Sequence, residues 1–241
     1  MKKVTRLILL LSLILIKVAS GQHFTNYTSA NGLPDNNVNG VAIDQNNNKW
    51  FGTQTGVAMF NDATWTTYKK ADGLIDNYIN CIAIDHTNHV WVGTDIGVSM
   101  FNGTTWSSYT TADGLAGGQV NYISSDKSGN VWFATGNGVS KFNGTTWTTY
   151  NTSNGLPNNM VSFITPDSTG NIWIGTWIGG LAKFDGSTFK TFTKADSLTD
   201  DNIISVAIDA SGNKWIATYY GVTELSSSDV WVQNFRQREG L

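Results

Sequence analysis

A segment of about 41 residues recurs five times, and this repeat limits the possible folds more than any other feature of the sequence. In each copy a Leu closes a short segment of the "NGL" or "DGL" type, and an Asp and a Trp follow in fixed register. The three columns are Leu33, Leu74, Leu115, Leu156 and Leu198; Asp44, Asp85, Asp126, Asp167 and Asp209; and Trp50, Trp91, Trp132, Trp173 and Trp215. Repeats of this length are supersecondary units that bury their apolar faces by stacking on their neighbours.

Each repeat has the pattern of four short strands separated by turns. In the second repeat the strands are "YINCIAID", "HVWVGT", "GVSMFN" and "TWSSY". The first turn has the form Asp, two residues, Gly, Asn, and the first two repeats carry Asn47 and Asn88 at the Gly position. Because Gly and Asn both tolerate positive φ, this exchange predicts a left-handed residue there. The third turn contains Asn102-Gly103 or its equivalent, which predicts a type I′ hairpin.

Stacked four-stranded units of this length predict an all-β fold, a β-propeller of five four-stranded antiparallel blades. The strand count also fits a partial or truncated propeller. "FTNY" at residues 24–27 matches "WTTY" at residues 65–68, so one outer strand precedes the first complete blade, and residues 236–241 begin a further repeat. The repeats span approximately residues 28–68, 69–109, 110–150, 151–192 and 193–235.

The first 21 residues have the pattern of a signal peptide. "MKKVTR" is basic, "LILLLSLILI" is apolar and too short to span a bilayer, and "KVASGQ" supplies small residues for cleavage. We therefore expect a propeller domain of residues 22–241 in the periplasm or outside the cell, with no membrane span. Its 11 basic and 18 acidic residues give a net charge of −7, which argues against nucleic acid as a partner.

The stretch "NGLPDNNVNGVAIDQNNNKWFGTQTGVAMFNDATWTTY" and its four successors resemble the two-component regulator propeller repeats in the periplasmic sensor regions of bacterial hybrid histidine kinases. The resemblance covers roughly all of the chain after the signal peptide. It implies a sensor module that binds an extracellular ligand, by resemblance a glycan fragment, and that has a sensor kinase or another protein as partner. The family's large sensors also contain more repeats, a further β-domain, a membrane helix and a kinase, which these 241 residues do not include.

The loop between the second and third strands varies most among the repeats, and it contains the one Trp that no repeat column explains. That residue, Trp177, lies where the fourth repeat has one extra residue. In an antiparallel meander this loop shares a face of the propeller with the segment between repeats. Aromatic rings next to amides and carboxylates suit a small ligand such as an oligosaccharide. The predicted ligand-binding residues are Trp177, Tyr219, Tyr220, Asp95, Asn137, Gln54, Asn36, Asn77, Asn159 and Asp201.

Two alternatives to glycan binding stay open. The aromatic residues can instead fill the wide end of a blade, in a protein-interaction or structural propeller without a small ligand. A carbohydrate-active enzyme would need two carboxylates, for which Asp76, Asp95 and Asp200 are the candidates.

We expect no enzyme, no metal site and no cofactor. Asp76 and Asp200 occupy equivalent repeat positions, which favours a role in a turn. His86 and His89 lie in a turn where the other repeats have ordinary polar residues, so a solvated loop is favoured over a metal pair. The single Cys81 is expected to be a buried, inert thiol.

Overall fold

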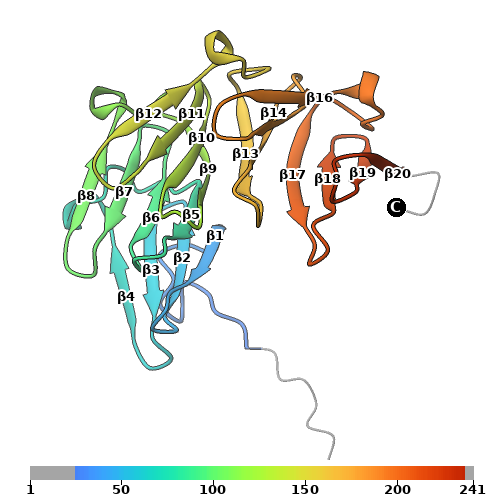
Figure 1. Ribbon diagram of the computed structural model, residues 1–241. Coiled ribbons are helices and arrows are strands. Elements are labelled where there is room, and N and C mark those ends of the chain that lie inside the picture. The colour runs from blue at the N-terminus through green and yellow to red at the C-terminus, as the bar shows by residue number, and fades with distance from the viewer. Residues whose placement is uncertain (1–24, 237–241) are drawn as a thin grey trace, which may run out of the picture.

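The computed structural model describes residues 25–236, and its regular structure there is almost entirely β. Five separate antiparallel sheets of four strands follow one another along this range (Figure 1). The five predicted blades of four strands are therefore confirmed. The predicted signal peptide and residues 237–241 of the predicted further repeat lie outside the described residues.

In every sheet the strands lie in chain order, and the first strand is the innermost. The first strands are β1 (Val38–Ile43), β5 (Cys81–Ile84), β9 (Val120–Ser125), β13 (Val161–Pro166) and β17 (Ile203–Ile208). The second strands are β2 (Lys49–Thr53), β6 (Val90–Gly93), β10 (Val131–Thr135), β14 (Ile172–Thr176) and β18 (Lys214–Thr218). The third strands are β3 (Gly56–Phe60), β7 (Val98–Phe101), β11 (Gly138–Phe142), β15 (Leu181–Phe184) and β19 (Gly221–Leu225).

The outer strands are β4 (Trp65–Tyr68), β8 (Trp106–Tyr109), β12 (Trp147–Tyr150), β16 (Phe189–Phe192) and β20 (Trp231–Phe235). Short 3-10 turns follow the first four of them, namely η1 (Lys70–Asp72), η2 (Thr111–Asp113), η3 (Thr152–Asn154) and η4 (Lys194–Asp196). We number the sheets as blades 1 to 5 in chain order.

The blades form an open arc. Each innermost strand packs on the innermost strand of the next blade, from β1 through β5, β9 and β13 to β17. No comparable packing joins β17 back to β1 within residues 25–236, and Figure 1 shows the first and last blades apart.

The core consists of apolar layers between neighbouring blades. Alternate residues of a strand point to opposite faces of its sheet, so each blade offers an apolar face to both neighbours. Between blades 3 and 4, for example, Trp132 and Val139 pack with Ile172, Ile174 and Phe184.

The first turn of each blade explains the Asp and Trp columns. In blade 3 the Asp126 carboxylate accepts the backbone N–H groups of Ser128 and Asn130, both at 2.9 Å, and the indole N–H of Trp132 at 2.8 Å. The same three donors recur in the other four blades. The predicted left-handed residue is confirmed, with φ of 64° at Asn47, 68° at Asn88 and 87° at Gly129.

These aspartates predict how stability depends on pH. Burial alone would raise the pKa of Asp126, but hydrogen bonds from Trp132, Asn130 and Ser128 hold it below its ordinary value of 3.8. The pKa of the corresponding aspartate is also lowered in each of the other blades. A lowered pKa adds stability that is present above the unfolded value and is lost as pH falls through the folded value.

We therefore expect the urea midpoint to fall steeply below about pH 4 and to change little between there and neutral pH, as followed by Trp fluorescence. Asp126→Asn should reduce the size of that acid loss. A midpoint that stays constant down to strongly acidic pH would contradict the expected role of these carboxylates.

The predicted type I′ hairpin at the third turn is wrong. Phe101 pairs with Trp106, so the loop has four residues, and only Gly103 of the Asn-Gly pair has positive φ, at 95°. Instead, the Asn102 side chain accepts the backbone N–H groups of Thr104 and Thr105, both at 2.9 Å. The Asn side chain thus accepts the N–H groups of the turn that would otherwise need a backbone carbonyl.

Cys81 is buried in β5, and burial raises the pKa of its thiol to about 12. Since the thiolate is the reactive species, we expect no alkylation by iodoacetamide in the folded protein and complete alkylation in denaturant. Mass spectrometry would measure this, and rapid labelling under native conditions would contradict it.

Candidate functional site

The loop between β14 and β15 departs from the repeat. Its Thr176 hydroxyl donates to the carbonyl of Gly180, four residues on, whereas the equivalent Thr135 reaches Gly138, three residues on. Ile178 in this loop has a φ of 60°, a strained value for a β-branched residue. Strained backbone of this kind concentrates at functional sites, and here it accompanies an exposed Trp177.

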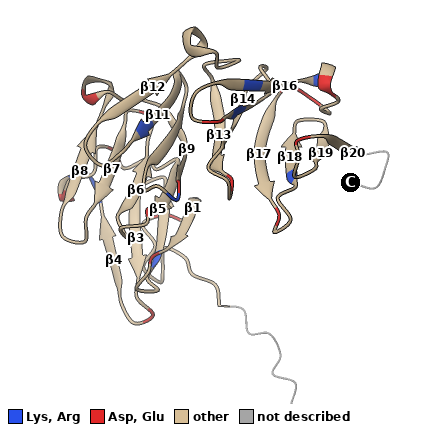
Figure 2. Ribbon diagram, viewed as in Figure 1, with Lys and Arg blue, Asp and Glu red and all other residues tan. Residues whose placement is uncertain are grey.

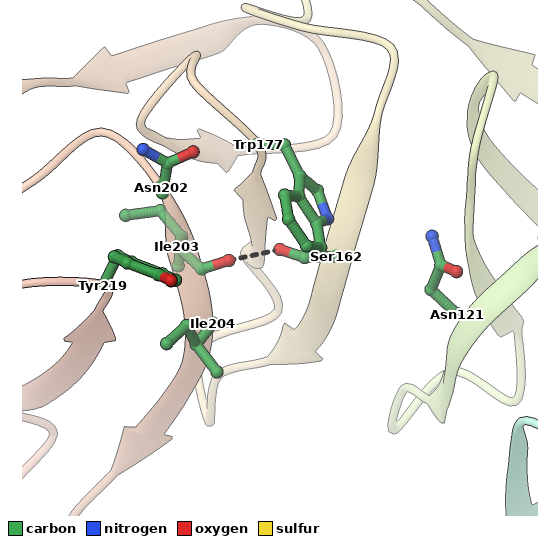
Figure 3. A pocket seen from close by; sticks show the side chains of 7 residues that line it. All are labelled: Asn121, Ser162, Trp177, Asn202, Ile203, Ile204 and Tyr219. Carbon is green, nitrogen blue, oxygen red and sulfur yellow. Dashed lines mark hydrogen bonds between the residues drawn. The ribbon is translucent and has the colours of Figure 1, made fainter.

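A pocket of about 320 Å³ lies between this loop and the next blade. Trp177 and Tyr219 line it from the loops of blades 4 and 5, and Ile203 and Ile204 line it from β17 (Figure 3). We call it the rim pocket. Its lining residues are Asn121, Ser162, Trp177, Asn202, Ile203, Ile204 and Tyr219.

Backbone hydrogen bonds fix both aromatic loops. The backbone N–H of Trp177 donates to the carbonyl of Met160 at 2.9 Å, and the backbone N–H of Tyr219 donates to the carbonyl of Asn202 at 3.2 Å. The side-chain oxygen of Asn202 also accepts the N–H of Ile178 at 3.2 Å. Asn202 therefore ties the two loops together at the edge of the pocket.

The innermost strands form one wall of the rim pocket, which is polar where β9 and β13 contribute to it and apolar where β17 does. The Asn121 amide donates to the carbonyl of Val161 at 2.7 Å, and the Ser162 hydroxyl donates to the carbonyl of Ile203 at 2.5 Å. The equivalent side chains of blades 1 and 2, Asn39 and Asn80, donate to the next blade in the same way. In blade 5 this position is Ile204, which has no donor and is exposed to the pocket.

Among the residues that the structure describes, none with a charged side chain lines the rim pocket. Figure 2 shows acidic residues mainly at the turns and several basic residues on strands, and β13 and β17 carry no charged residue along their length. The pocket therefore suits an uncharged ligand with apolar faces.

The structure brings only part of the predicted site together. Trp177 and Tyr219 share the rim pocket, and the ring of Tyr220 meets that of Tyr219 edge to face at 5.5 Å. The other predicted loop residues lie on blades 1 to 3, outside the pocket. Gln54 approaches the Tyr78 hydroxyl at 3.5 Å, Asp95 accepts from Asn80 at 2.8 Å, and Asn137 donates to the carbonyl of Ala116 at 3.2 Å.

Asn36, Asn77, Asn159 and Asp201 have a structural role. Each side chain accepts the backbone N–H of the residue seven positions earlier, at 2.7 or 2.8 Å. These bonds brace the 3-10 turn, or its counterpart before blade 1, between an outer strand and the next innermost strand. This bracing of the turn is enough to explain why four of the five repeats have an amide or a carboxylate at this position.

Sequence reasoning missed five lining residues of the rim pocket. Ile204 was detectable, because it is the one apolar residue in the column Asn39, Asn80, Asn121, Ser162 and Ile204. Asn121, Ser162, Asn202 and Ile203 follow their repeat columns and carry no such signal.

The carboxylates proposed for an enzyme each serve a local hydrogen bond. Asp76 accepts the N–H of Asn77 at 2.6 Å, and the buried Asp200 accepts the N–H of Asn202 at 2.9 Å. His89 lies 3.2 Å from Asp85 in the first turn of blade 2. Within residues 25–236, no three His, Cys, Asp or Glu side chains are grouped so that they could hold a metal ion, and no helix has the length and hydropathy of a membrane span.

The fold and its repeat define the class of this protein, a β-propeller with blades of about 41 residues. The family model described as "Two component regulator propeller" matches residues 73–95, 114–137 and 155–178, one segment in each of three successive repeats. The last match includes Trp177. No curated protein sequence matches the chain significantly.

Among solved structures, the chain is similar to the extracellular domain of a hybrid two component system from B. thetaiotaomicron. The identity is 26% and the TM-score 0.74, over 87% of this chain and 29% of that one. The chain therefore spans less than a third of that relative.

Two further structures are similar in fold alone. Virginiamycin B lyase from Staphylococcus aureus has 16% identity and a TM-score of 0.66, over 83% of this chain and 70% of that one. PorZ, a surface component of the type-IX secretion system of Porphyromonas gingivalis, has 16% identity and a TM-score of 0.61, over 83% and 34%.

Proposed function

We propose that this propeller is the ligand-binding module of an extracellular sensor and that its ligand occupies the rim pocket. The observation that carries the proposal is the pairing of Trp177 and Tyr219 across an uncharged pocket, with Trp177 on the one loop that is a residue longer than its counterparts. The similarity to an extracellular domain of a two component system supports the sensor role. In this role the protein lies in the periplasm or outside the cell, and a sensor kinase or another protein transmits the signal.

The proposed ligand is a neutral glycan fragment. Trp and Tyr rings stack on the C–H faces of sugars, and amide and hydroxyl groups bind their hydroxyls. Asn121 has a side-chain oxygen that accepts no hydrogen bond from residues 25–236, so it is available to a sugar hydroxyl. The absence of lining charges excludes a strong preference for acidic sugars.

Binding without turnover fits the site better than glycoside hydrolysis does. Hydrolysis requires two carboxylates flanking the scissile bond, and none lines the rim pocket. The likeness to a lyase at 16% identity concerns the fold alone.

A protein ligand is the second candidate, favoured by the exposed apolar residues around the pocket. Met160, Ile178 and Tyr220 are all exposed next to Trp177 and Tyr219. Clustered exposed apolar side chains are typical of protein contacts.

A panel of neutral and acidic oligosaccharides, measured by calorimetry with the full secreted chain, tests the proposal. We expect saturable binding of one or more neutral members and no consumption of the bound sugar. If the whole panel fails to bind, the glycan proposal is wrong. Turnover that disappears with Asp95→Asn would identify an enzyme instead.

A further inference from the structure

The chain contains six Asn-Gly pairs, and the third turns of blades 2 and 3 hold two of them. The pairs are Asn31-Gly32, Asn39-Gly40, Asn102-Gly103, Asn137-Gly138, Asn143-Gly144 and Asn154-Gly155. In such a pair the backbone nitrogen of Gly can attack the side-chain carbonyl carbon of Asn, because Gly has no side chain to hinder the approach. The fold decides which pairs keep the groups of this reaction free.

The attacking and the leaving nitrogen atoms are both free in the third turns. The backbone N–H groups of Gly103 and Gly144 donate no hydrogen bond within residues 25–236, and nothing lies within 4 Å of the position where a side chain would begin. The Nδ2 atoms of Asn102 and Asn143 also have no partner in this range, and both residues are exposed. Neither pair therefore has to break a hydrogen bond to nitrogen before it reacts.

The side-chain oxygen of each Asn is already bound by two donors. Asn102 Oδ1 accepts the backbone N–H groups of Thr104 and Thr105, both at 2.9 Å, and Asn143 accepts the equivalent pair at 3.0 and 2.8 Å. Attack on Cγ places negative charge on this oxygen. Backbone N–H groups aimed at an oxygen on which charge develops stabilise that charge.

The other four Asn-Gly pairs are restrained by the fold. Gly138 and Gly155 donate their N–H groups to backbone carbonyls, at 2.7 and 3.2 Å. Asn39 lies in β1 and donates its amide to a carbonyl of blade 2 at 2.8 Å. Gly32 packs on Trp65, whose Cγ would lie 2.4 Å from a Cβ atom there. These pairs are therefore expected to react only when the structure opens locally.

The third turn of blade 4 shows that a carboxylate fits this position. It has Asp185-Gly186 in place of Asn-Gly, and Asp185 accepts the backbone N–H groups of Ser187 and Thr188 at 2.8 and 2.7 Å. Hydrogen bonds from the backbone of Thr188 and Ser187, and from their hydroxyl groups, hold the pKa of the Asp185 carboxyl far below its ordinary value of 3.8. The same turn thus accepts the ionised form without rearrangement.

We propose that Asn102 and Asn143 are modification sites, at which the folded protein deamidates spontaneously with water as the only co-reactant. The Gly nitrogen forms a bond to Cγ of the Asn, and its proton leaves with Nδ2 as ammonia. Water then opens the five-membered imide. Cleavage of the new N–Cγ bond gives Asp, and cleavage of the original peptide bond gives isoaspartate.

The Asp product keeps the acceptor that Asp185 provides in blade 4. These turns and the loop of Trp177 lie at opposite ends of the third strands of their blades, so conversion leaves the rim pocket unchanged. Each conversion adds one negative charge to the opposite side of the propeller.

The test incubates the folded full chain at mildly alkaline pH in water enriched in heavy oxygen. Each deamidation takes up solvent oxygen, so peptide mapping by mass spectrometry separates it from conversion during later digestion in ordinary water. We expect uptake at Asn102 and Asn143 to be at least about tenfold faster than at Asn137 and Asn154, whose Gly neighbours must first break a hydrogen bond. In urea, where this protection is lost, we expect all six pairs to convert at similar rates.

The matched control is Gly103→Asp, because Asp62 follows Asn61 in the same turn of blade 1 with a φ of 71°. Asn61 also accepts two backbone N–H groups, at 3.1 and 2.7 Å, but no Gly follows it. We expect conversion at Asn102 to fall to the low level of Asn61 in this variant, while Asn143 converts as before.

Equal uptake at Asn102 and Asn137 in the folded chain would overturn the proposal. So would an absence of uptake at Asn102 and Asn143 over a period in which the chain in urea converts completely.

Discussion

Trp177→Ala should weaken oligosaccharide binding by about 10- to 100-fold while leaving the urea midpoint unchanged. The indole forms one wall of the rim pocket and is 51% exposed, so its loss removes a stacking surface and no core packing. Tyr219→Ala should act in the same way. Tyr219→Phe should retain most of the affinity, because the ring remains.

Tyr220→Ala is the matched control. Tyr220 is as exposed as Tyr219 and touches its ring, but it does not line the rim pocket. Its removal should leave glycan affinity within about twofold of the native value. Equal losses for Tyr219→Ala and Tyr220→Ala would favour the broad protein contact over the pocket. If Trp177→Ala binds the glycan with unchanged affinity, the glycan does not bind in the rim pocket.

Trp173→Ala, only four residues away, should have the opposite effect. Trp173 is fully buried on β14, stacks on Phe192 at 5.7 Å, and donates its indole N–H to Asp167 at 3.0 Å. We expect the free energy of unfolding to fall by about 3 to 5 kcal/mol, the range for a buried aromatic changed to Ala.

Urea unfolding followed by circular dichroism would measure this loss. Trp173→Phe keeps an aromatic ring but leaves Asp167 without its indole donor, so we expect a smaller loss of about 1 to 3 kcal/mol. A loss below about 1 kcal/mol for Trp173→Ala would mean that the layer between blades 4 and 5 contributes little to stability.

Several local features could be predicted from the sequence, because each depends on a few adjacent residues. The exchange of Gly for Asn at Asn47 and Asn88 predicted positive φ, and the structure shows it. The same reasoning failed at Asn102-Gly103, where the Asn side chain accepts two backbone N–H groups and relieves Asn102 of the left-handed backbone. A turn dipeptide such as Asn-Gly can adopt more than one backbone conformation, and the hydrogen bonds of the side chain determine which one forms.

The candidate site was predicted less completely. Trp177 was found because it breaks the repeat, but Asn36 and Asp201 were assigned to the site although their side chains brace turns. The same polar residue types suit a structural hydrogen bond and a contact with a ligand, so residue type alone does not distinguish the two roles. Only their hydrogen-bond partners distinguish the two roles.

The sequence by itself determined the strands, the blades and their order, because the repeat places the same short-range hydrogen bonds and apolar columns in every copy. The tertiary structure alone decided the rim pocket. Trp177 and Ile204 are far apart along the chain and meet because β17 packs beside β13. The exposure of β1 was likewise decided in three dimensions, since Val41 is exposed where no preceding blade covers it, whereas the equivalent Ile164 is buried.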